Sequence, residues 1–403
     1  MAVLPATATE AMTETLPPPD AHAAHVVLRG WSDAADPETA AAEIAAALSG
    51  PPLAFVLVFL GPRHDRGRTA RALHARFGPV PVIGCTTAGE IGPGGYATDS
   101  IVALGFPAAQ FSLATRLVAP LDRFRIEDGP EIAGALLAHD PADPSAAGSW
   151  PHAVAIMLAD GQARQEDALA SAISPSLGSV PLIGGSAGDG LSFDRSFVLH
   201  GGRFHGNAAL LALIRSRCPL SVFRFDHMVP SESRLVVTAA DPAARLVREI
   251  NAAPAAAEYA RLIGMAPEEL SPFVFAAHPV VVRVGGQHYV RAIQKAEPDG
   301  SLRFYCAIGE GVVLSLAERR DMSAHLDGVL TGLADPAPPD LLLGFDCVLR
   351  RLEAEQQQSA PTVSEILARH RVLGFSTYGE QYGPMHLNQT LTGVAIYPQT
   401  GTA

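Results

Sequence analysis

The sequence contains few cysteines and no pair of them spaced for a metal ion or a disulfide bond. The four present lie far apart in the chain, at Cys85, Cys218, Cys306 and Cys347. No CxxC motif occurs, so the usual structural zinc sites are excluded, and the spacing indicates no disulfide framework. Dispersed single thiols are typical of a reducing compartment. We therefore expect four reduced cysteines and a cytoplasmic protein.

Long apolar runs and an excess of positive charge are also absent. No stretch approaches the roughly 18 uninterrupted apolar residues of a membrane span, and the first residues show neither the basic start nor the apolar stretch of an export signal. We expect residues 1–24, which include a triple proline, to form a flexible tail. The formal net charge of −12 repels phosphate backbones and anionic lipids. Nucleic acids and membrane insertion are therefore not expected.

The common catalytic motifs are missing as well. A Walker loop, a strand-borne GxGxxG, an HExxH and a GxSxG do not occur, so nucleotide hydrolysis, dinucleotide redox chemistry, zinc proteolysis and α/β-hydrolase chemistry lack their residues. Cys85 lies in a glycine-rich turn, where a thiol enzyme would need a histidine beside it. Related segments have Gly185 and Phe375 in the same position, which favours a packing role for Cys85. We do not expect an enzyme.

What the sequence does contain is an internal repeat. Its 403 residues, of which 48% are hydrophobic, suffice for two or three domains. Residues 53–106, 152–214 and 340–397 each read as strand, helix, strand, glycine-rich turn and strand. Short runs rich in Val, Ile and Leu suit buried strands. The repeat predicts an α/β fold with mixed β-sheets flanked by helices.

The segments around the repeats complete this expected architecture. Asp36-Pro37 and Asp241-Pro242 each resemble an N-cap followed by proline at the first helical position, so we expect a helix after each pair. Residues 274–308 read as a β-meander, with turns at the glycine pair 285–286 and at Pro-Asp-Gly 298–300. This meander belongs to the C-terminal half, and we expect the domain boundary near residue 240.

Hydroxyl-bearing residues follow the second strand of the first and third repeats. GCTTAGE at residues 84–90 aligns position by position with GFSTYGE at residues 374–380, whereas the second copy, PLIGGSAGDG at residues 181–190, needs a gap. Open α/β sheets bind ligands at the carboxyl ends of their strands. Glycine also serves simply to permit tight turns. If the turns do bind a small ligand, the predicted contacts are Thr86, Thr87, Ser376, Thr377, Glu380 and Asn388.

One histidine stands beside the third of these turns. His386 is accompanied by Tyr378, Tyr382 and Met385, so an imidazole and an apolar surface occur together. A haem needs that combination, namely an axial nitrogen and an apolar wall. The alternative is that His386 hydrogen-bonds the backbone of the turn. The other candidate axial ligands are His288, His278 and His205.

These segments together resemble a known family. VIGCTTAGEI, PLIGGSAGDG, the meander and the closing GFSTYGEQYGPMHLNQTLTGVAIY are similar to the FIST domain over roughly residues 25–398. The resemblance implies an N-terminal FIST part at residues 25–240 and a C-terminal FIST part at residues 241–398. FIST domains are sensory modules of bacterial signalling that bind small ligands.

The short connection QYGPMHL between the GE and NQT elements is similar to that of stand-alone FIST proteins of the NosP group. This resemblance implies haem b, with His386 as the predicted metal ligand and Met385, Tyr378, Tyr382 and His288 as further cofactor contacts. It also implies nitric oxide as the signal and a histidine kinase as the partner. The alternative is a haem-free sensor of an amino acid or similar metabolite. A homo-oligomer is left open.

Overall fold

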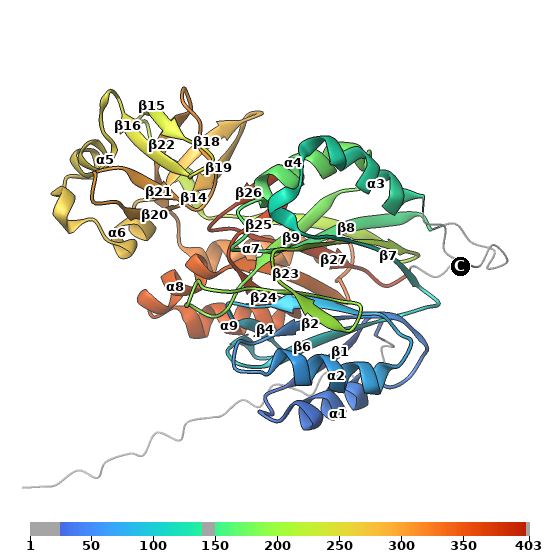
Figure 1. Cartoon of the computed structure of the whole chain (residues 1–403). Coiled ribbons are helices and arrows are strands. Elements are labelled where there is room, and N and C mark those ends of the chain that lie inside the picture. Colours follow the sequence, from blue (N-terminus) through green and yellow to red (C-terminus); the bar gives the residue numbers. More distant parts are fainter. Residues whose placement is uncertain (1–24, 139–149, 400–403) are drawn as a thin grey trace, which may run out of the picture.

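Three α/β units form the main body of the molecule (Figure 1). The computed structural model describes residues 25–138 and 150–399, so the predicted tail at residues 1–24 lies outside the described residues. The first unit comprises β1 (Leu28–Ser32), α1 (Pro37–Ala47), β2 (Leu53–Leu60), α2 (Arg66–Phe77), β3 (Val82–Thr86), β6 (Ile101–Pro107). Its four strands are ordered β1-β6-β2-β3, and only β2 and β3 are parallel.

The second and third units repeat this arrangement. The second comprises β7 (Phe111–Val118), α3 (Gly129–Leu137), β8 (His152–Asp160), α4 (Glu166–Ser176), β9 (Leu182–Ala187), β12 (Ala209–Ser216). The third comprises β13 (Leu220–Phe225), α7 (Met322–Gly332), β23 (Leu341–Cys347), α8 (Val348–Gln356), α9 (Ala360–Arg369), β24 (Val372–Thr377), β27 (Leu391–Ile396). Their strand orders, β7-β12-β8-β9 and β13-β27-β23-β24, match that of the first unit. The predicted mixed α/β fold is confirmed.

Each unit gives a two-stranded hairpin to a different unit. The hairpins are β4 (Glu90–Gly92) with β5 (Gly95–Ala97), β10 (Val198–His200) with β11 (Arg203–His205), and β25 (Glu380–Tyr382) with β26 (Met385–Leu387). β4 pairs with β24 of the third unit, β25 with β9 of the second, and β10 with β3 of the first. The exchange closes a ring of three six-stranded sheets. Equivalent positions in the three units can therefore be read from the strand registers.

Three equivalent glycines allow the parallel strands to approach closely. Gly84, Gly184 and Gly374 lie at the same position of β3, β9 and β24. A Cβ atom at Gly84 or Gly374 would lie 1.8 Å from a carbonyl oxygen of the neighbouring strand, and one at Gly184 would lie 1.9 Å away. Because backbone cannot yield as a side chain can, this spacing explains why glycine recurs in all three repeats.

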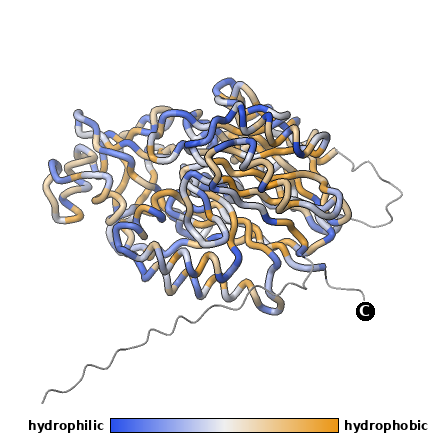
Figure 2. Tube along the Cα trace, turned by 90° about the horizontal axis from the view of Figure 1, so that it is seen from below, coloured by the Kyte–Doolittle hydropathy of each residue, from blue (hydrophilic) through white to orange (hydrophobic). Residues whose placement is uncertain are grey.

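The main hydrophobic core lies between the three sheets. Its aromatic centre joins the first and third units, since the Phe59 ring lies 4.6 Å from that of Phe375 and 6.5 Å from that of Phe345. Helices cover the outer faces (Figure 1), and hydrophobic residues concentrate in the strands between them (Figure 2). All four cysteines are buried and unpaired. None of the helices in the described ranges is long and apolar enough to span a membrane.

A second body, which we call the inserted sheet, interrupts the third unit between β13 and α7. It comprises β14 (Met228–Pro230), β15 (Leu235–Asp241), β16 (Leu246–Ile250), β17 (Ala253–Pro254), α5 (Ala255–Ile263), α6 (Pro272–Ala277), β18 (Val280–Val284), β19 (Gln287–Arg291), β20 (Ile293–Ala296), β21 (Leu302–Phe304), β22 (Val313–Arg319). Its nine strands form one sheet, drawn in yellow and orange in Figure 1. The domain boundary expected near residue 240 stays a prediction. Strand pairing places residues on both sides of position 240 in the inserted sheet.

The segments outside the repeats match the expectations in part. The helix expected after Asp36 is α1, whose first turn is capped by the Asp36 carboxylate accepting from the Thr39 amide at 3.0 Å. The prediction of a helix after Asp241-Pro242 is wrong. Pro242 to Arg245 form a turn between two strands, because the Asp241 carboxylate instead accepts from the Ala244 amide and LVREI alternates as a strand. In the meander, the strands begin at Val280, after helix α6.

Candidate functional site

His386 lies inside the protein on β26, at the junction of the second and third units. The residue is 1% exposed. The amide nitrogen of Gln381, on the paired strand β25, donates to His386 Nδ1 at 3.2 Å and also lies 3.1 Å from Ser186 Oγ. Burial lowers the pKa of His386, so the imidazole is neutral. Since Nδ1 accepts a hydrogen bond, the ring proton lies on Nε2.

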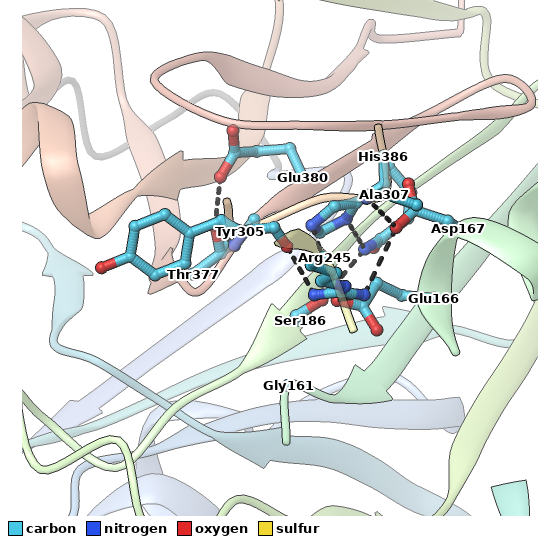
Figure 3. A network of polar contacts seen from close by, with 12 residues as sticks. Gly161, Glu166, Asp167, Ser186, Arg245, Tyr305, Ala307, Thr377, Glu380 and His386 are labelled. Atoms are coloured by element: carbon cyan, nitrogen blue, oxygen red, sulfur yellow. Dashed lines mark hydrogen bonds and ion pairs between the residues drawn. The ribbon is translucent and has the colours of Figure 1, made fainter. Parts of the chain in front are cut away.

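An arginine of the inserted sheet holds the acidic start of helix α4 beside this histidine (Figure 3). Arg245 lies on the turn between β15 and β16, and its guanidinium contacts the Glu166 carboxylate at 2.9 Å and that of Asp167 at 3.3 Å. The same guanidinium donates to the carbonyl of Tyr305. From β19, Arg291 donates to the His386 carbonyl at 2.8 Å. Two arginines therefore attach the inserted sheet to the second unit and to the β25–β26 hairpin that pairs with it.

Several buried polar atoms at this junction have no hydrogen-bond partner. They belong to His386 (Nε2), Glu166 (Oε2), Gln381 (Oε1) and Asn388 (Oδ1). His386 Nε2 lies 3.6 Å from Glu166 Oε1, which is longer than a hydrogen bond. More than nine in ten buried polar groups are normally paired, so a contiguous cluster of unpaired ones needs an explanation. A functional site that receives a polar group is one such explanation.

Gly379 makes room for this cluster. Its φ of 144° lies in a region that other residues rarely adopt, and a Cβ atom there would lie 2.2 Å from His386 Cε1 and 3.1 Å from the Asn388 amide nitrogen. Packing of His386 and Asn388 therefore requires glycine at position 379, the second glycine of the GFSTYGE motif. The turn of this motif places polar side chains in the interior rather than on the surface.

A small cleft opens next to the cluster, where β8 ends and the chain turns into α4. Its volume is about 50 Å³. Both bodies contribute to the lining, which includes Gly161, Gln162, Arg164, Glu166, Phe193, Arg245, Gln294, Arg303, Tyr305 and Tyr378. The Phe193 ring stacks on Tyr378 at 4.4 Å and lies 6.4 Å from Tyr305. Because the carboxyl end of a strand and an interface between bodies meet here, the cleft has the usual place of a ligand site.

The predicted turn residues form buried hydrogen-bond networks at the bases of two hairpins. Thr377 donates to the Glu380 carboxylate, whose other oxygen accepts from the Thr390 hydroxyl at 2.6 Å. Thr87, Glu90 and Ser100 repeat this pattern in the first unit. Burial raises the pKa of Glu380 to about 8. These buried side chains hold the exchanged hairpins in place.

The other predicted ligand-binding residues are also internal. Thr86 accepts from the Phe197 amide at 3.0 Å, and the Ser376 hydroxyl has no partner. Asn388 adjoins His386, and Tyr378 lines the cleft. Four of the predicted residues therefore lie around one junction, namely Tyr378, Glu380, His386 and Asn388. Thr86 and Thr87 belong to the first unit.

The surroundings of His386 do not fit a haem. Its free nitrogen faces Glu166, and the adjoining cleft of about 50 Å³ is far smaller than the several hundred Å³ of ordinary cofactor pockets. Met385 and Tyr382 are paired neighbours on the hairpin, and successive residues of a strand point to opposite faces, so Met385 does not share a wall with His386. Within the described ranges, no cluster of three His, Cys, Asp or Glu side chains is arranged to hold a metal ion.

The remaining candidate histidines lie elsewhere. His288, on β19, lines a separate open groove of the inserted sheet with a volume of about 830 Å³. His278 follows α6, and burial lowers its pKa. His205 Nε2 lies 3.1 Å from the His200 carbonyl oxygen. The structure does not bring these histidines to the His386 junction.

Sequence reasoning missed Glu166 and Arg245. The acidic pair Glu166-Asp167 at the start of a predicted helix is a detectable signal, although such acids are common at helix N-termini for electrostatic reasons alone. Arg245 gave no signal, because its segment resembled a helix and its partners lie 78 and 79 residues away.

Comparison with known proteins identifies the family. The FIST N domain model matches residues 54–253, and the FIST C domain model matches residues 255–383. No curated protein sequence matches the chain. The two matches follow each other directly and together span most of the sequence. The chain therefore belongs to the FIST family, whose domains are sensor modules that bind small ligands in signal transduction.

Proposed function

We propose that this protein senses a small carboxylate-bearing metabolite, such as an amino acid, in the cleft between α4 and the inserted sheet. The observation that carries the proposal is the cluster of unpaired buried polar atoms beside the cleft, above all Glu166 Oε2 and His386 Nε2. A ligand's ammonium or hydroxyl group that reached these acceptors and donors would remove the cost of leaving them unpaired.

The lining of the cleft supports this choice of ligand. Arg164 is exposed and makes no ion pair among the described contacts, so its guanidinium is available for a carboxylate. The amide side chains of Gln162 and Gln294 add hydrogen-bonding groups. The rings of Phe193 and Tyr305 offer an apolar wall. Cationic, anionic and aromatic groups in one cleft suit a zwitterionic amino acid better than a uniformly charged or wholly apolar molecule.

The position of the cleft supports a mechanism of sensing. A volume of about 50 Å³ holds a few waters and no amino acid, so binding requires the inserted sheet to move relative to the second unit. The ligand then favours the more open arrangement by its differential affinity for the two states. We propose that a partner histidine kinase reads this difference, as the sequence resemblance implies.

A thermal unfolding screen tests this function. The probes are the proteinogenic amino acids and small dicarboxylates at millimolar concentration, and at least one is expected to raise the midpoint of unfolding of the wild-type protein. Arg164→Gln should abolish that increase, because it removes the available cation. Arg195→Gln, which changes an exposed arginine outside the cleft, should retain it. A screen without any stabilising probe, or an equal response in Arg164→Gln, would contradict the proposal.

A second candidate function is the haem-based sensing of nitric oxide, and the groove at His288 favours it. Val313 gives this groove an apolar side chain on the same face as His288, and Arg234 and Arg283 stand beside it. A haem would be held by the His288 imidazole, and the guanidinium groups of Arg234 and Arg283 would pair with its propionates. Haem would supply the iron that binds nitric oxide.

An absorption spectrum of protein expressed with a supply of haem distinguishes the two functions. The haem hypothesis predicts a Soret band that His288→Ala removes and that His386→Ala retains. Loss of the band in His386→Ala alone would instead support the axial ligand expected from the sequence. Absence of a Soret band in the wild-type protein would contradict haem binding altogether.

A further inference from the structure

A second cleft lies at the opposite end of the first unit from its glycine turn. It is bounded by the end of α2, the loop leading into β3 and the turn of the β10–β11 hairpin, and its volume is about 330 Å³. That volume lies within the range of small-molecule pockets. The lining includes Pro79, Val80, Pro81, Ile83 and Leu199, with His74 and His200 among them. The cleft is therefore mainly apolar, with two imidazoles.

Comparison with the β4–β5 hairpin shows how the hairpin beside the cleft differs. Where the β4–β5 hairpin packs on the third unit, Gly95 lies so close to α9 that a Cβ atom would approach Ser364 to 2.4 Å, and the Tyr96 amide donates to Ser364 Oγ at 3.2 Å. The strand registers put Arg203 at the position of Gly95. The Arg203 side chain is exposed and does not line the cleft. Around Gly201, in the hairpin turn, no heavy atom lies within 4 Å of an added Cβ position.

The polar side chains of the cleft are two imidazoles and one hydroxyl group. His200 Nε2 lies 3.1 Å from the Thr115 hydroxyl, and the two side chains line the cleft together. Burial lowers the pKa of His200, and the neighbouring His205 lowers it further, so the imidazole is neutral at pH 7. His74 makes no side-chain hydrogen bond among the described contacts. A neutral imidazole both donates and accepts.

We propose that this cleft binds a small uncharged aromatic molecule carrying one hydroxyl or ring N–H group, such as a phenol or an indole. The proline and valine walls provide the apolar contact for a ring, and the volume suits a molecule of one or two rings. The polar group of the ligand pairs with His74, because His200 already has the Thr115 hydroxyl as a partner. A charged ligand is disfavoured, because the lining provides no permanent charge of opposite sign. This site is independent of the cleft at Glu166.

Titration with p-cresol and toluene tests the proposal, since these probes differ only in the hydroxyl group. The wild-type protein should bind p-cresol, observed as shifts of the His74 and His200 ring protons in NMR spectra. Toluene should bind about 5-fold more weakly, which corresponds to the loss of one hydrogen bond. Equal binding of the two probes, or shifts at other histidines only, would overturn the proposal.

The internal repeat provides a matched control for a variant that fills the cleft. Val80→Trp introduces a large ring into the lining and should abolish p-cresol binding. Val180→Trp changes the equivalent half-buried valine of the second unit and should leave binding unchanged. If the tryptophan variants fail to fold, His74→Ala changes an exposed side chain and should weaken p-cresol binding about 5-fold. Unchanged binding in both Val80→Trp and His74→Ala would refute the site.

Discussion

At the scale of single residues, the threonine and glutamate of the two repeated motifs have a structural role that the structure makes plain. GCTTAGE and GFSTYGE share a threonine and a glutamate that hydrogen-bond each other at the base of a hairpin. The sequence did not predict this role, because the further partners Ser100 and Thr390 lie 10 residues beyond each glutamate. The sequence alone does indicate that Gly89 and Gly379 recur. It does not indicate that one of them accommodates His386.

The buried carboxyl of Glu380 predicts a dependence of stability on pH. Its pKa of about 8 in the folded protein exceeds the ordinary value of 4.5, so the folded state binds this proton more tightly. The resulting stabilisation is present below pH 4.5 and is lost as the pH rises through about 8. Glu90, whose pKa burial also raises, acts in the same direction.

Denaturant unfolding at several pH values measures this effect. The contribution of Glu380 should lower the free energy of unfolding by at most about 1.4 kcal/mol per pH unit across that range. Glu380→Gln should reduce the slope, and Glu90→Gln combined with Glu380→Gln should reduce it further. A slope equal to that of the wild-type protein in the double variant would show that these carboxyls are not protonated in the folded state.

At the scale of secondary-structure elements, the main strands and helices of each repeat could be predicted, whereas the two short strands of each hairpin and the pairing between repeats could not. Runs such as VLVFL identify a buried strand by composition, whereas the exchange of hairpins depends on contacts between residues more than a hundred positions apart, as for β10 with β3. The turn at Asp241-Pro242 has the same start signal as helix α1. Only the strand-like alternation that follows distinguishes them.

The close pairing of parallel strands predicts a strong effect of glycine replacement. Gly374→Ala should destabilise the protein by about 3 kcal/mol or more, because the new methyl group would lie 1.8 Å from the Gly344 carbonyl oxygen. Gly134→Ala is the control, since no atom lies within 4 Å of the added group in helix α3. This variant should gain about 0.5 to 1 kcal/mol. Similar stabilities of the two variants in chemical denaturation would argue against the proposed strand contact.

At the scale of the whole molecule, the two chain crossings between the three-unit body and the inserted sheet meet at one place. The Arg320 amide donates to the His227 carbonyl at 2.9 Å, and His227 Nε2 lies 3.0 Å from the Glu353 carboxylate of α8. The Arg245 contacts form a separate attachment, at α4. Release of the Arg245 contacts and of the Arg291 contact with the His386 carbonyl would let the inserted sheet pivot about its attachment at His227. The sequence could not reveal this arrangement, because no signal in it marks residues 228–319 as an insertion between β13 and the rest of the third unit.

The most direct test of ligand sensing in the cleft is hydrogen exchange of the full chain, with and without the amino acid or dicarboxylate that stabilises it most. The proposed site predicts altered exchange in residues 161–167, in the turn at residues 242–245 and in residues 303–306, which surround the cleft from both bodies. Arg164→Gln should show no such change at the same ligand concentration. Ligand-dependent protection confined to other segments, or present equally in Arg164→Gln, would contradict the account.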